Sequence, residues 1–136
     1  AITVLRVGSG GALTPGGFTL DLSGSTGGQT VARLNFTGSQ TAFGSLVDGR
    51  YQIAVDRRLV LDSGGRAMAA DYSANFHRFF GDVNGDRRGD IADFGLFAVS
   101  YLNAANYIAA FDFNGDGRID IADFGQFALR FFTTLP

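Results

Sequence analysis

The hydrophobic residues change their spacing partway along the chain, at about residue 72. Before this point, apolar and polar residues alternate in short runs separated by Gly, Ser, Thr and Asp, which is typical of half-buried strands joined by turns. After it, apolar residues recur every three or four positions, as on one face of an amphipathic helix. We therefore expect residues 1–72 to form a small antiparallel β domain and residues 73–136 a small α-helical domain.

Five short runs in the first half carry the strand pattern. Three of them, Phe18–Leu22, Val31–Phe36 and Tyr51–Val55, each have an apolar face that we expect to point inward, such as Phe18, Leu20 and Leu22, and a second face that points outward. The predicted strands are Ile2–Val7, Phe18–Leu22, Val31–Phe36, Tyr51–Val55 and the shorter Leu59–Leu61.

Two stripes in the second half predict amphipathic helices. In each stripe the apolar residues fall at positions i, i+3, i+4, i+7 and i+8. The first stripe consists of Phe94, Phe97, Ala98, Tyr101 and Leu102, and the second of Phe124, Phe127, Ala128, Phe131 and Phe132.

A sequence repeat with an offset of 30 residues underlies these two stripes. Residues 82–95 align with residues 112–125, and Asp, Asn, Asp, Asp and Asp recur at positions 1, 3, 5, 9 and 12 of a twelve-residue loop. Eight of the 13 acidic residues lie in these two loops. An acidic surface that only needed solvation would not keep the same spacing twice.

This spacing is the one that a calcium ion requires. Calcium takes about six to eight oxygen ligands, and an EF-hand loop supplies them from positions 1, 3, 5, 7, 9 and 12, with the backbone carbonyl acting at position 7. The alternative is a pair of Asp-, Asn- and Gly-rich turns without metal. The predicted ligands of two Ca²⁺ ions are Asp82, Asn84, Asp86, the Arg88 carbonyl, Asp90 (directly or through water) and Asp93, and Asp112, Asn114, Asp116, the Arg118 carbonyl, Asp120 and Asp123.

The two loops differ at positions 6 and 8. The second loop has Gly117 at position 6, where the chain turns sharply, and Ile119 at position 8, where it is expected to anchor the loop in the core. The first loop has Arg87 and Gly89 at these positions. We expect it to bind calcium less tightly or with a looser backbone.

Position 12 is Asp in both loops, whereas most EF-hands carry Glu there. With the duplicated D-x-N-x-D-x-x-x-D-x-x-D pattern, a helix after each loop and a missing or shortened first helix, residues 80–132 resemble a dockerin. Dockerins are calcium-folded modules of secreted proteins that dock onto cohesin domains. The resemblance implies partner recognition just before each position-12 Asp, at Ile91, Ala92, Ile121 and Ala122, on a near two-fold surface.

The first half is similar to the bacterial Ig-like domains of surface proteins. Leu46–Tyr51 is typical of a tight corner that feeds a strand, the setting of the tyrosine corner, and Leu61–Ala69 resembles the closing segment of such domains. An Ig-like sandwich has about seven strands, so we expect its first strand or strands to be missing. Either the chain is a piece of a longer protein, or another subunit supplies the missing strand.

Composition narrows the classes of function. The formal net charge of −2 argues against nucleic-acid binding, and no apolar run approaches the roughly 18 residues of a membrane span. The chain has no Cys, all of its acidic residues are Asp, all of its basic residues are Arg, and His77 is its one imidazole. Because this inventory for acid–base catalysis is thin, we expect no enzymatic activity, and no small-molecule substrate is indicated.

These patterns predict a non-catalytic extracellular or cell-surface module that binds calcium and serves attachment or assembly. The partner is another protein, or further copies of the chain that join through β edges into a filament by strand donation. The alternative is a C-terminal docking module of a larger secreted hydrolase with a cohesin-like partner. Asn35 heads an N-glycosylation motif, Asn35–Thr37, and is expected to point outward.

Overall fold

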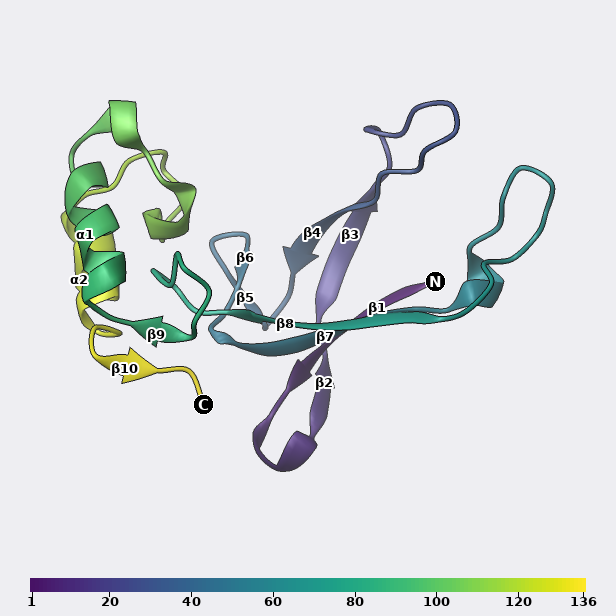
Figure 1. The fold of residues 1–136 in the computed structure, drawn as a ribbon, viewed down its shortest axis with the longest axis horizontal. Helices are drawn as coiled ribbons and strands as arrows, with labels where there is room; N and C mark the ends of the chain where they lie inside the picture. The colour runs from purple at the N-terminus through teal and green to yellow at the C-terminus, as the bar shows by residue number, and fades with distance from the viewer. The chain divides into compact units, whose positions relative to one another are not determined.

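The computed structural model describes residues 1–136 and divides into two compact units. Antiparallel β-sheets in the N-terminal part are followed by a small C-terminal region with two short helices (Figure 1). This order of β and α structure confirms the coarse fold class that the hydrophobic spacing predicts. Unit 1 comprises Ala1–Leu46 and Arg50–His77, and unit 2 comprises Val47–Gly49 and Arg78–Pro136.

The main sheet of unit 1 has four strands in the order β2–β1–β7–β8. β1 (Ile2–Val7) pairs antiparallel with β7 (Gly49–Val55). The alternating sequences predict both strands but not their pairing. β2 (Leu13–Pro15) and β8 (Tyr72–Arg78) form the two edges, and the sequence pattern predicts neither. A short 3₁₀ turn, η1 (Ser9–Gly11), lies between β1 and β2.

Two antiparallel hairpins complete the β structure of unit 1. β3 (Gly17–Asp21) pairs with β4 (Arg33–Thr37), close to the predicted runs, and β5 (Thr41–Ala42) pairs with β6 (Ser45–Leu46). Figure 1 shows the β3–β4 hairpin crossing one face of the main sheet. The core between them consists of Val4, Leu46 and Tyr51, with Phe18, Leu34, Phe36 and Ile53 packed against it.

Two predictions about the strands of the first half need correction. Leu20 and Leu22 are 47% and 48% exposed rather than buried, because they lie toward the end of a two-stranded hairpin. The predicted strand Leu59–Leu61 is also wrong. Asp56 accepts a hydrogen bond from the Arg58 N–H and starts a 3₁₀ turn, η2 (Arg57–Leu59), after which Leu61 forms only an isolated bridge.

The division between the units falls after His77 rather than at residue 72, because Tyr72–Arg78 is the edge strand β8 and does not begin a helical region. Within unit 1, the Phe76 ring of β8 stacks on the Tyr51 ring with centroids 5.4 Å apart. Alternation of apolar and polar residues therefore continues beyond residue 72, through β8.

Unit 2 is built on α1 (Ile91–Ser100) and α2 (Ile121–Ala128). The Phe97 and Phe127 rings stack at 4.8 Å between the helices, each from a predicted stripe. Two 3₁₀ turns, η3 (Ala104–Asn106) and η4 (Ala109–Phe111), connect the helices, and β9 (Arg88–Gly89) pairs with β10 (Thr133–Thr134). The buried core of unit 2 consists of Phe80, Phe97, Phe111, Ile119 and Phe127.

The far ends of the predicted stripes lie outside the helices. Helix α1 ends at Ser100 and α2 at Ala128, so the chain has already turned at Leu102 and Phe132. These two residues have positive φ angles of 52° and 59° and are 74% and 78% exposed. Their assignment to the buried stripes was wrong, because the left-handed conformation ends the helical periodicity that the assignment assumes.

Candidate metal centre

The first carboxylate of each loop closes the turn that follows it. Asp82 accepts hydrogen bonds from the backbone N–H groups of Gly85, Asp86 and Arg87 at 2.8, 3.1 and 2.8 Å. In the second loop Asp112 repeats this arrangement, with the same three bonds at 2.7, 3.2 and 2.8 Å. Position 1 therefore has the same local geometry in both loops.

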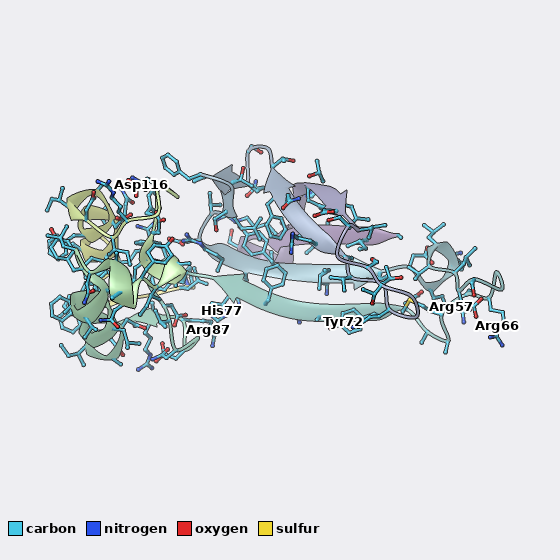
Figure 2. All side chains as sticks on the ribbon, turned by 90° about the horizontal axis from the view of Figure 1, so that it is seen from above. Arg57, Arg66, Tyr72, His77, Arg87 and Asp116 are labelled. Carbon is cyan, nitrogen blue, oxygen red and sulfur yellow. The ribbon has the colours of Figure 1, made fainter.

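Positions 3 and 5 interact through their side chains. The Asp86 N–H donates to Asn84 Oδ1 at 2.9 Å, and Asn84 Nδ2 donates to Asp86 Oδ2 at 3.2 Å. Asn114 and Asp116 make the matching bonds at 3.1 and 2.9 Å. Figure 2 shows Arg87 of the first loop and Asp116 of the second on different sides of the helical unit.

Positions 9 and 12 form a capping box at the start of each helix. Asp90 accepts from the Ala92 N–H at 2.9 Å, while Asp93 accepts from the N–H groups of Asp90 and Val83 at 3.1 and 2.9 Å. Asp123 plays the same part at α2, and the carboxylates of Asp93 and Asp123 are 1% and 0% exposed. Hydrogen bonds from backbone N–H groups thus hold the position-12 carboxylates in place at the start of each helix.

Position 6 is left-handed in both loops, with φ of 69° at Arg87 and 81° at Gly117. An L-residue with a side chain pays roughly 1–2 kcal/mol to adopt this conformation, whereas glycine does not. The first loop therefore keeps the backbone shape of the second, but with strain at Arg87.

Position 8 joins each loop to the end of the other helix. The Leu102 N–H, after α1, donates to the Ile119 carbonyl at 2.9 Å, and the Phe132 N–H, after α2, donates to the Gly89 carbonyl at 2.6 Å. Ile119 is buried in the core, as predicted. A Cβ atom at Gly89 would lie 2.5 Å from the Arg130 carbonyl oxygen, so close approach of backbone requires glycine at this position.

The second loop has an additional hydrogen bond from outside the repeat. The Tyr107 hydroxyl donates to Asp112 Oδ2 at 2.7 Å. Burial raises the pKa of the Asp112 carboxyl, but the bonds from Tyr107 and from three loop N–H groups outweigh it and hold that pKa below its usual range. The same hydrogen bond raises the pKa of Tyr107 to about 12.

The donor set fits calcium in chemical type and order, since each loop presents only carboxylate, amide and carbonyl oxygens at the spacing of an EF-hand loop. No three carboxylate or imidazole side chains gather closely enough to form a ready-made metal cluster. The carboxylates of each loop accept hydrogen bonds from its backbone N–H groups instead. An ionised carboxylate has about four lone-pair sites. The loop N–H bonds to Asp82 occupy three of these sites, whereas Asp112 accepts four hydrogen bonds, so a cation there would have to replace one of them, such as the bond from Tyr107.

The residues predicted to recognise a partner are at the surface of unit 2. Ile91 and Ile121 are 69% and 70% exposed, and Ala92 and Ala122 are also exposed. Ile121 lines an open apolar groove together with residues of both helices. The other lining residues are Phe94, Phe97, Ala98, Tyr101 and Phe124.

Sequence reasoning missed a cluster of charges in unit 2. Asp48 forms salt bridges with Arg78 and Arg130, and it accepts a hydrogen bond from the Phe80 N–H at 2.8 Å. The Arg78 and Arg130 guanidinium groups lie 5.3 and 5.4 Å from the centre of the Phe80 ring. Asp48 falls in the predicted corner before β7, and no local pattern indicates that it belongs with residues 78–136.

No protein-family model matches the chain, no curated protein matches it in sequence, and no solved structure matches its fold. The dockerin and Ig-like resemblances therefore depend on the quoted residues alone. Neither helix is long and apolar enough to cross a membrane.

Proposed function

We propose that the chain is a non-catalytic extracellular module that binds two calcium ions and serves attachment or assembly at the cell surface. The observation that carries this proposal is the repeated geometry of the two loops. Nine hydrogen bonds in residues 82–93 recur at the same atoms in residues 112–123. Two surface turns without a ligand would not require the same nine hydrogen bonds in both loops.

Within each loop the residues at positions 1, 3, 5, 7, 9 and 12 would hold the ion, as in the ligand sets given above. Calcium would neutralise four carboxylates that otherwise repel one another. Because the position-12 carboxylates also cap α1 and α2, holding the ion and ordering the helices are coupled, and metal-binding free energy becomes folding free energy.

The calcium proposal is tested by measuring how many ions the chain binds. Isothermal titration calorimetry should give two ions for the wild type and one each for Asp93→Asn and Asp123→Asn. Asp62→Asn is the matched control, because Asp62 also accepts loop N–H bonds but lies outside both loops, and it should still bind two. Absence of calcium binding by the folded wild type would contradict the proposal.

The apolar surface of unit 2 supports a protein partner for this module. Ile91 and Ile121 occupy the same position in each repeat and leave most of their surface to solvent. The groove beside Ile121 offers phenylalanine and tyrosine rings from both helices. Exposed apolar surface of this kind is typical of protein–protein interaction sites.

The β structure of unit 1 supports self-assembly by strand donation. Its core has only three buried apolar residues, and each of four others leaves 40% or more of its surface exposed, namely Leu13, Leu20, Leu22 and Val31. The seven-residue strand β8 has a neighbour on one side only. We interpret this unit as an Ig-like sandwich that lacks its first strand or strands, which a neighbouring copy would supply.

Ile121→Asp separates the two modes of assembly. Because Ile121 is 70% exposed, the change should leave the fold intact, and Ile91→Asp is its matched counterpart in the first repeat. Loss of binding to a separate partner with intact self-association supports recognition through the helices. The reverse result supports assembly through β edges, which electron microscopy of the native material would show as filaments.

The second candidate is a C-terminal docking module of a larger secreted hydrolase. The identical Ile-Ala dipeptides before the two position-12 Asp residues favour it, because they present the same side chains in both repeats. This candidate requires a cohesin-like partner bound one to one, and a pull-down against cohesin domains that recovers none would argue against it.

A further inference from the structure

The β3–β4 hairpin of unit 1 has one apolar and one polar face. Its cross-strand pairs Phe18–Phe36 and Leu20–Leu34 lie on the face that reaches the core. The alternate pairs lie on the opposite face. These are Gly17–Thr37, Thr19–Asn35 and Asp21–Arg33.

The polar face holds both reacting parts of the glycosylation motif. Asn35 and Thr37 are two residues apart in β4, so they share this face, and both are exposed. The residue between them, Phe36, packs against the core of unit 1. The fold therefore uses the middle residue of the motif for stability and leaves its acceptor amide and hydroxyl in solvent.

The residues opposite the motif are small. Gly17, opposite Thr37, adds no side chain to this face, and the strands lie close there, since an added Cβ would lie 2.9 Å from the Thr37 carbonyl oxygen and 3.1 Å from its hydroxyl. The cross-strand neighbour of Asn35 is the short, exposed side chain of Thr19. The Asp21–Arg33 pair lies one step further along the hairpin, 3.5 Å apart, with the Arg33 side chain 69% and the Asp21 side chain 33% exposed.

We infer that Asn35 is a site of N-linked glycosylation on the outer face of the β3–β4 hairpin. Asn35 heads the one Asn-X-Ser/Thr motif in the sequence. In the reaction, the Asn35 side-chain nitrogen attacks the anomeric carbon of a lipid-pyrophosphate-linked oligosaccharide. A C–N bond forms, the bond from that carbon to the pyrophosphate oxygen breaks, the nitrogen loses one proton, and the lipid pyrophosphate leaves.

This inference depends on the export of the chain that the proposed function includes, but not on calcium binding. A glycan here would occupy a face of the hairpin and not the edge of a strand. It would also increase the solubility of a unit whose surface carries several exposed apolar residues.

Mass spectrometry of the native protein tests the inference. Trypsin cuts after Arg33 and Arg50, and peptide 34–50 contains Asn35 as its one asparagine. If a glycan hinders cleavage at Arg33, peptide 7–50 gives the same information, because it also contains no other asparagine. We expect a glycan mass on this peptide, and an aspartate at position 35 after enzymatic removal of the glycan.

Secreted expression in a eukaryotic cell line provides matched variants. Thr37→Ser keeps the motif and should keep the modification, whereas Thr37→Ala and Asn35→Gln should lose it. Native peptide found only in unmodified form overturns the inference, as does a glycan that persists in Thr37→Ala. Calcium titration of the same samples distinguishes this inference from the calcium proposal. If Asn35 is not glycosylated, the number of calcium ions that the chain binds should still be two.

Discussion

Asp48 and Arg130 lie 82 positions apart in the chain and form a salt bridge inside unit 2. Asp48 also pairs with Arg78, and all three side chains are only about a fifth exposed, at 20%, 19% and 22% for Asp48, Arg130 and Arg78. One carboxylate thus compensates two guanidinium groups that are largely removed from water. Unit 2 therefore contains a residue that the chain supplies from the corner between β6 and β7.

Replacing Asp48 with Ala should destabilise unit 2 by about 2–3 kcal/mol, because two partly buried arginines lose the carboxylate that compensates their charge and the Phe80 N–H loses its acceptor. Chemical denaturation followed by circular dichroism measures this loss. Asp21→Asn is the matched control, since the Asp21–Arg33 pair is more exposed and 3.5 Å long, and it should change stability by less than about 1 kcal/mol. Equal effects of the two substitutions would show that the Asp48 cluster does not stabilise the unit.

Gly89→Ala should destabilise unit 2 by about 1–3 kcal/mol, because the new Cβ would lie 2.5 Å from the Arg130 carbonyl oxygen and backbone would have to move. Gly95→Ala, in the same unit, should have the opposite effect on stability. Gly95 lies inside α1 with open space around it, so alanine should stabilise the helix by roughly 0.5–1 kcal/mol. Both values come from thermal or urea unfolding, and a neutral Gly89→Ala would contradict the close approach.

The carboxyl group of Asp56 in unit 1 should have a lowered pKa. Hydrogen bonds from the Arg58 side chain, and then from the Arg58 backbone N–H, lower the pKa of Asp56 from 3.8 to about 2. Because the folded-state pKa lies below the unfolded value, the stability that this interaction contributes is fully present above pH 3.8 and is lost as the pH falls through about 2. NMR titration of the Asp56 carboxyl carbon gives this pKa directly. In Arg58→Ala the pKa should rise toward 3.8, and an unchanged value would rule out the Arg58 side chain as its main cause.

Removal of calcium should melt α1 and α2 before the β-sheets of unit 1. Each loop then retains four carboxylates that repel one another. Two of the four cap the helix that follows, as Asp90 and Asp93 cap α1, so their repulsion disturbs the start of the helix. Circular dichroism in excess chelator should lose the helical signal and recover it when calcium is added back. Full helix content in the chelator would contradict the coupling between calcium binding and helix folding. Magnesium is the control ion, because it prefers a smaller octahedral site and should restore less helix.

Local pattern determined much of this protein. The alternation in residues 2–7 and 51–55 predicts β1 and most of β7, because a strand with one buried face requires a period of two. The repeated stripes predict both helices and bring Phe97 and Phe127 into the core. The capping box at Asp90 and Asp93 is also local, since all its partners lie within three residues.

Tertiary structure decided the features that join distant residues. The sequence cannot show that Asp48 belongs with Arg130, that Gly89 lies against the Arg130 backbone, or that Phe132 binds the first loop while Leu102 binds the second. Each contact depends on how separate segments pack, and no residue spacing records it. The ends of the helices follow the same rule, because the reciprocal hydrogen bonds at position 8 hold Leu102 and Phe132 outside them.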